Sequence, residues 1–180
     1  MITADLLIEV VEQATKEVFA MMLGAEVTRE PANGAPLEGG VVSLVGLTGN
    51  WSGTGTVSCN PAAAIQIAAL MLLLDTSEGN QSVDDEVLDA VAELTNMVIG
   101  NIKNLLAERL GEMAISIPTV VYGKNFRFKN VAGMQEHSAV FRWDDFLIEV
   151  KIGLAQTLET NSSTRKRLEV PAFSAALTLI

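Results

Sequence analysis

The chain has 180 residues, 49% of them hydrophobic and 19% charged, a composition typical of a globular protein with one compact domain. Twelve lysines and arginines stand against 22 acids, so the formal charge of -10 repels phosphate backbones and anionic lipids. We therefore expect neither nucleic acid nor a membrane as a partner. The acidic start of the chain and its single cysteine lead us to expect a cytoplasmic protein.

The first half of the chain predicts two helices separated by a β-hairpin. Apolar residues recur at helical spacing over residues 3–23. The segments 41–45 and 56–59 are rich in β-branched residues and predict strands, and the glycine-rich segment 46–55 between them predicts a hairpin turn. The apolar segment 62–74 is too short to span a bilayer and predicts a buried core helix.

The second half predicts one long helix followed by three strands. The helix is expected to begin at Ser82 and to run to about Leu110. Strands are expected over residues 114–122, 138–143 and 146–154, and the last of these has alternating apolar and charged residues. Short connections of this kind favour an α+β fold, in which an antiparallel β-sheet packs against long α-helices.

The end of the chain differs in composition from the rest. Residues 156–180 combine a polar stretch, the basic cluster Arg165, Lys166 and Arg167, and an apolar end. We expect one domain over residues 1–155 and a C-terminal extension over 156–180, which would consist of a linker and a final strand.

Several kinds of chemistry are excluded by what the chain lacks. With one histidine and one cysteine, it cannot assemble zinc sites built on these residues, Cys–His dyads or CxxC redox pairs. The glycine-rich segment 46–55 lacks the lysine of a phosphate-binding loop. His137 precedes a predicted strand, and we expect it to be a solvated loop residue.

The long helix has two distinct faces. At about 100° per residue, a polar face lies opposite its apolar stripe, and this polar face carries Asp89, Glu93, Asn96 and Gly100. A carboxylate and a carboxamide thus stand one turn apart and can address the same partner surface. A glycine in a helix interior lowers the stability of the helix by about 1 kcal/mol relative to alanine. A docking surface at Gly100 would explain why a glycine stands there. The apolar stripe consists of Val87, Val91, Leu94, Val98, Ile102 and Leu105.

The bare pattern E-x-x-N is weak evidence. It occurs a second time at Glu30 and Asn33, where the adjacent Pro31 makes a helical face implausible. From the residues alone, the solvated face of a long acidic helix is the favoured interpretation of Glu93 and Asn96. A small-molecule-binding α+β domain has little support, because no other polar residues converge.

The wider sequence around this pair resembles a known family. Residues 93–103, ELTNMVIGNIK, resemble the helix signature of the CheX branch of the CheC/CheX/FliY family, and the upstream segment 46–53, GLTGNWSG, extends the likeness. The resemblance implies a CheC/CheX-like fold. It also implies a phosphatase that acts on the aspartyl phosphate of a CheY-like response regulator in chemotaxis or two-component signalling.

The resemblance also implies roles for individual residues. Asn96 would orient the attacking water, and Glu93 would pair with the lysine of the regulator's active site, while Asp89, Gly100 and Lys103 would contact the partner. The chain would bind no cofactor of its own, because the regulator carries the Mg²⁺. Family members are dimers, so a homodimer is expected. The alternative is a non-catalytic adaptor of the same fold that binds a receiver domain or a flagellar switch component.

Overall fold

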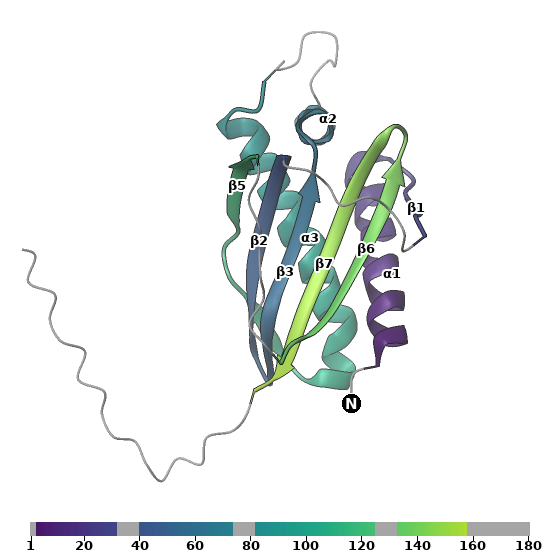
Figure 1. Ribbon diagram of the computed structural model, residues 1–180, viewed down its shortest axis with the longest axis vertical. Helices are drawn as coiled ribbons and strands as arrows, with labels where there is room; N and C mark the ends of the chain where they lie inside the picture. Colours follow the sequence, from purple (N-terminus) through teal and green to yellow (C-terminus); the bar gives the residue numbers. More distant parts are fainter. Residues whose placement is uncertain (1–2, 32–39, 74–81, 125–132, 158–180) are drawn as a thin grey trace, which may run out of the picture.

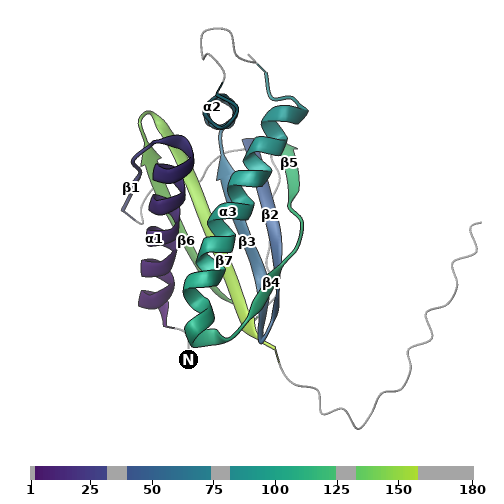
Figure 2. The same ribbon diagram turned by 180° about the vertical axis from the view of Figure 1, so that it is seen from behind.

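The computed structural model describes residues 3–31, 40–73, 82–124 and 133–157 and shows one antiparallel sheet with helices on one of its faces (Figures 1 and 2). Along the sheet the strands follow the order β1-β6-β7-β3-β2, and both β4 and β5 pair with β2. The helices are α1 (Ala4–Leu23), α2 (Pro61–Met71) and α3 (Asp85–Leu110), and the strands are β1 (Thr28–Arg29), β2 (Gly40–Gly49), β3 (Trp51–Cys59), β4 (Met113–Ile115), β5 (Thr119–Gly123), β6 (Gln135–Trp143) and β7 (Phe146–Gln156).

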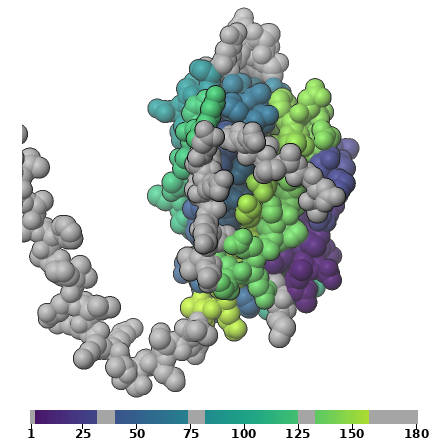
Figure 3. All heavy atoms as spheres, in the orientation of Figure 1, coloured from purple at the N-terminus to yellow at the C-terminus, as the bar shows by residue number. Residues whose placement is uncertain are grey.

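This architecture confirms the expected α+β class. Seen from the helical side, α3 crosses the middle of the sheet between α1 and the β4–β5 edge (Figure 2). On the opposite side none of the described helices covers the sheet (Figure 1), and β6 forms part of the molecular surface (Figure 3). Among the described residues, no helix is both long enough and apolar enough to cross a membrane.

The start of α3 and the end of α2 differ from the predicted bounds. The long helix α3 begins at Asp85 rather than Ser82, because Asp84 is its N-cap and its side chain accepts a hydrogen bond of 3.0 Å from the Val87 amide. The apolar helix α2 ends at Met71, three residues before the expected end. The two described residues that follow it, Leu72 and Leu73, are exposed.

The predicted hairpin is present, but the glycine-rich segment 46–55 is strand on both sides of Asn50 rather than one long turn. Strand β2 ends at Gly49 and β3 begins at Trp51, so Asn50 alone connects the two strands, which pair as far as Leu47 and Gly53. A side chain at Gly53 would collide with the backbone carbonyl of Gly153 on β7. Gly53 therefore permits the close approach of the neighbouring backbone of β7.

The strand predicted over residues 114–122 is two strands, β4 and β5, separated by residues 116–118. Pro118 has no amide to donate to a ladder, which explains the break. The last strand is longer than predicted and extends to Gln156, one residue past the expected domain boundary. The predicted extension beyond Thr157, with its basic cluster, lies outside the described residues, as does most of the loop that precedes β2.

The position of His137 also corrects the prediction. It lies within β6 opposite Ile152 and is half-buried. Its Nε2 atom is buried and has no hydrogen-bond partner within the described parts of the chain. Burial, together with the positive charge of Arg29, lowers the pKa of this imidazole.

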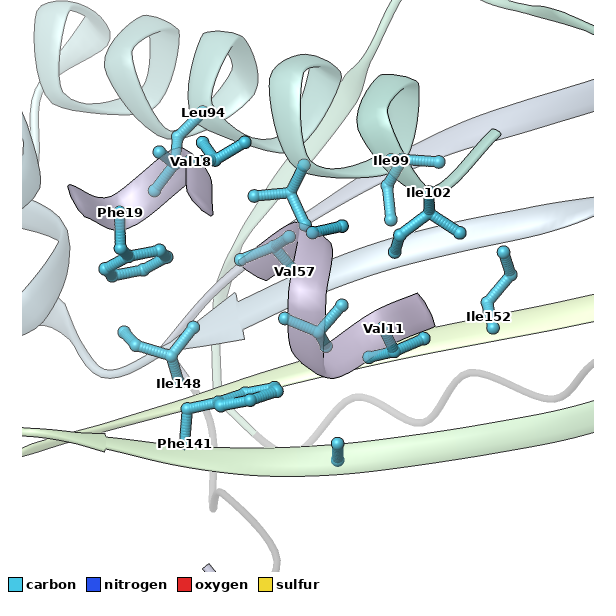
Figure 4. Close-up of a cluster of buried hydrophobic side chains, with 14 of the residues drawn as sticks. Val11, Val18, Phe19, Val57, Leu94, Ile99, Ile102, Phe141, Ile148 and Ile152 are labelled. Carbon is cyan, nitrogen blue, oxygen red and sulfur yellow. The ribbon is translucent and has the colours of Figure 1, made fainter. Parts of the chain in front are cut away.

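The core lies between the sheet and the helices (Figure 4). The predicted apolar stripe of α3 is fully buried at Val91, Leu94, Val98 and Ile102. Leu105 is only half-buried, and Leu106 takes the core position instead. The inward residues of β7 alternate along the strand as predicted, with Ile148, Val150, Ile152 and Leu154 buried.

Candidate functional site

The candidate site is the polar face of α3, defined as Asp89, Glu93, Asn96, Gly100 and Lys103. Asp89 and Glu93 are exposed, whereas Asn96, Gly100 and Lys103 are half-buried. Successive members are three or four residues apart on one continuous helix, so their side chains share a single face. The structure therefore brings together all five residues that the sequence singles out, and their roles stay predictions.

The functional groups on this face are available to a partner. Within the described ranges, neither Glu93 nor Asn96 makes a side-chain hydrogen bond or an ion pair. A free carboxylate can accept from a cation, and a free carboxamide can accept with its oxygen while donating with its nitrogen. The pair can thus bind a cation and a water molecule at the same time.

The opposite face of α3 holds the pair in place. Ile99 is fully buried and packs on the backbone of β3 at Gly55. Thr95 is also buried, and its hydroxyl donates a 2.7 Å hydrogen bond to the Val91 carbonyl within the helix. Asn101 ties α3 to its neighbour α1 by donating a hydrogen bond of 2.9 Å to Glu17. This bond, together with one from Gln13, lowers the pKa of the Glu17 carboxyl.

Gly100 lies where α3 meets β4. A β-carbon at this position would lie 3.7 Å from Ile115 Cδ1, an ordinary contact distance, and outside the helix's own backbone no other atom of the described residues would lie within 4 Å of it. Packing within the chain therefore does not require glycine here. The absence of a side chain leaves a smooth stretch of helix beside Asn96, on which another molecule could pack closely.

The described residues line a hollow of about 1140 Å³ next to the β2–β3 hairpin and the last turn of α3. Asn50, Trp51 and Arg109 are among the residues that line it, and none of the five site residues does. The sequence gives no prediction of this hollow, because it is formed by segments far apart in the chain.

Metal ligands and reactive thiols are not grouped at the site. Within the described ranges, no three residues among histidine, cysteine, aspartate and glutamate lie close enough together to hold a metal ion. Cys59 is buried in the core, and this burial raises the pKa of its thiol to about 12. The polar face thus offers the carboxylates of Asp89 and Glu93, the carboxamide of Asn96 and the ammonium group of Lys103, and any further group would come from a partner.

Comparison with known proteins decides the family. Residues 41–142, which include the whole polar face, match the family model of chemotaxis phosphatase CheX. The chain belongs to the CheX family. A relative from Thermotoga maritima, described as CheY-P phosphatase CheX, is 29% identical over 132 residues, which cover 68% of this chain and 83% of the relative.

Solved structures of CheX and related proteins have the same fold. CheX from Vibrio vulnificus superimposes with a TM-score of 0.72 at 22% identity, over 86% of this chain and all of that one. A CheC-like protein from Shewanella superimposes with a TM-score of 0.69 at 27% identity, and the match covers 86% of this chain and 99% of that one. A complex of CheX with CheY, BeF3 and Mg²⁺ from Borrelia burgdorferi superimposes with a TM-score of 0.67 at 24% identity. The match covers 83% of this chain and 97% of that one.

Proposed function

We propose that this protein is a phosphatase that hydrolyses the aspartyl phosphate of a CheY-like response regulator. The observation that carries the proposal is the pair Glu93 and Asn96, which are accessible and without partners on one face of a rigidly packed helix in a CheX-family chain. The name of the Thermotoga relative and the composition of the Borrelia complex support the same substrate.

Asn96 would orient the attacking water. Phosphoryl transfer proceeds by in-line attack, and its catalysis comes mainly from positioning and from neutralisation of charge. A carboxamide can hold a water molecule against the phosphoryl group without adding a negative charge that would repel it. Asn96 is half-buried, so its side chain has less rotational freedom than a fully exposed one and is partly preorganised for this task.

Glu93 would fix the orientation of the partner. Its exposed carboxylate stands one helical turn before Asn96 and would pair with the lysine of the regulator's active site. Asp89 and Lys103, seven residues to either side of Asn96, would contact the partner at the margins of the same face. The Mg²⁺ that neutralises phosphoryl charge would be held by the regulator.

We also propose that the protein is a homodimer, as the family resemblance implies. A sheet with unpaired outer strands offers edges through which two copies can pair. Sedimentation of the full chain at micromolar concentration should give twice the monomer mass.

The test of the proposed function is phosphate release from a phosphorylated CheY-like regulator. Catalytic amounts of the wild-type protein should shorten the lifetime of the aspartyl phosphate. Glu93→Ala should raise KM more than it lowers kcat, because it removes one partner of an intermolecular ion pair. Binding of the regulator without any acceleration of phosphate release would contradict the phosphatase and would support the adaptor.

A further inference from the structure

Two methionines lie next to the polar face of α3 on the side of α1. Met97 follows Asn96 directly and lies one helical turn beyond Glu93, so its side chain neighbours the Glu93 carboxylate on the helix surface. Met97 is half-buried, and it packs against the core while part of it remains at the surface. Met21 lies near the end of α1 and is 71% exposed. Apolar groups therefore reach the surface beside the candidate site.

A pair of hydrogen bonds fixes α1 relative to α3 close to these methionines. Asn101 on α3 donates a hydrogen bond of 2.9 Å to Oε2 of Glu17 on α1. Gln13, one turn earlier on α1, donates a second bond of 2.9 Å to Oε1 of the same carboxylate. Both oxygens of Glu17 are thus engaged, and bonds to an ionised carboxylate are stronger than bonds between neutral groups.

The bond between Glu17 and Asn101 also places Met21 across from Met97. Helix α1 runs upwards in Figure 2 and α3 runs downwards, so the two helices are antiparallel, and they contact each other. Met21 is four residues after Glu17. Met97 is four residues before Asn101, so the two steps cover about 6 Å each in the same direction. Residues four apart share one flank of a helix, so Met21 and Met97 lie on the flanks that face each other. We call these two side chains the methionine pad.

A partner that engages both Glu93 and Asn96 must also cover Met97. A specific protein interface removes about 800 Å² of each partner from water, which corresponds to a patch of roughly 16 Å radius. Met97 lies about 6 Å from Glu93 along the helix, well inside such a patch. The interface that uses the polar face therefore includes an apolar group directly beside the carboxylate.

We propose that the methionine pad is the apolar part of the docking surface for the receiver domain, so that the regulator lies over the α1 side of α3. This inference rests on the proposed function. Methionine is unbranched and polarizable, and it suits surfaces that adapt to a partner. An apolar group bordered by a free carboxylate has the composition of an interface with a charged margin. Since Glu93 would pair with the regulator's lysine, the matching surface on the regulator is an apolar patch next to that lysine.

The test is steady-state phosphate release by Met21→Ser, Met21→Leu and a control, Ile117→Ser. Ile117 is 87% exposed between β4 and β5, at the edge of the sheet far from α1, which contacts β6 and β7. Met21→Ser should raise KM for the phosphorylated regulator about tenfold, equivalent to about 1.4 kcal/mol of binding, with kcat unchanged. Met21→Leu remains apolar and should keep the wild-type KM, as should Ile117→Ser. Because Met21 is so exposed, its variants should fold, and their melting temperatures verify this.

A KM for Met21→Ser equal to that of Ile117→Ser would overturn the pad. Equal impairment of Met21→Leu and Met21→Ser would overturn the apolar contact. A raised KM accompanied by slower sedimentation would also overturn it, because Met21 would then belong to contact between two copies.

Failure of the proposed function is distinguishable from failure of the pad. If the wild-type protein releases no phosphate, the proposed function fails, and the pad is judged by binding of the beryllofluoride-loaded regulator. Met21→Ser should then bind this regulator about tenfold more weakly than Ile117→Ser does. Equal binding by the two variants would overturn the pad independently.

Discussion

Ile99 on α3 packs directly against the backbone of Gly55 on β3. A β-carbon at position 55 would lie 2.7 Å from both Cδ1 and Cγ2 of Ile99, which is closer than side chains approach. Ile99 is three residues beyond Asn96, so this contact fixes how far the helix that carries the polar face stands from the sheet.

Gly55→Ala should therefore destabilise the fold. The β-branched Ile99 has little rotameric freedom in a helix, so the added methyl group must push α3 away from the sheet. We expect a loss of about 1–3 kcal/mol in the free energy of unfolding, as overpacked cores show. Chemical denaturation of the two proteins measures the difference, and equal midpoints would contradict the close contact.

Gly100→Ala should have the opposite effect on stability. A β-carbon there meets only Ile115 at 3.7 Å, and alanine is favoured over glycine in a helix interior by about 1 kcal/mol. We expect a more stable protein whose KM for the phosphorylated regulator is raised, because the new methyl group stands between the partner and α3. A variant that gains stability and keeps the wild-type KM would show that Gly100 does not serve docking.

The contrast between these two glycines shows what the sequence could and could not predict. The mid-helix position of Gly100 and the 3.6-residue period of α3 are local features, so the polar face and its apolar counterpart are readable from residues 85–110 alone. The role of Gly55 is set by β7 and α3, which lie far away in the chain. Its segment therefore resembles a turn in the sequence although it is a strand in the fold.

The distinction between local and long-range signals also explains why the predictions missed the strand break at Pro118 and the position of His137. Pro118 is a local signal for the break between β4 and β5, and a stricter application of the strand rule would have predicted it. The half-buried position of His137 depends on how far β6 extends towards its N-terminal end, where the residues are polar and give no alternating pattern. Pairing with the strongly patterned β7 sets that boundary.

His137 should make stability depend on pH. Its pKa in the folded protein is lowered by burial and by Arg29, so the unfolded chain binds the proton more readily than the native one. The free energy of unfolding should therefore have its full value above the ordinary histidine pKa of about 6.5 and should fall as the pH drops below it.

The measurement is the melting temperature at pH 7.5 and at pH 5.5. His137 is the single histidine of the chain, so few other side chains titrate in this range. The side chain of His137→Phe cannot be protonated. The melting temperature of this variant should therefore fall less between pH 7.5 and pH 5.5 than that of the wild type. Equal losses would mean that the imidazole does not carry the effect.

The most direct test of the central claim, that Asn96 positions the attacking water, is the kcat for phosphate release by Asn96→Ala. Asn104→Ala provides the matched control, since Asn104 is an exposed asparagine of the same helix that lies eight residues, or about 12 Å along the helix axis, beyond Asn96. We expect Asn96→Ala to lower kcat by about a hundredfold, as the loss of a group that positions a reactant does, while Asn104→Ala keeps the wild-type rate. Folding of both variants is verified by their melting temperatures. A kcat for Asn96→Ala equal to that of Asn104→Ala, with both proteins folded, would contradict the assignment of Asn96.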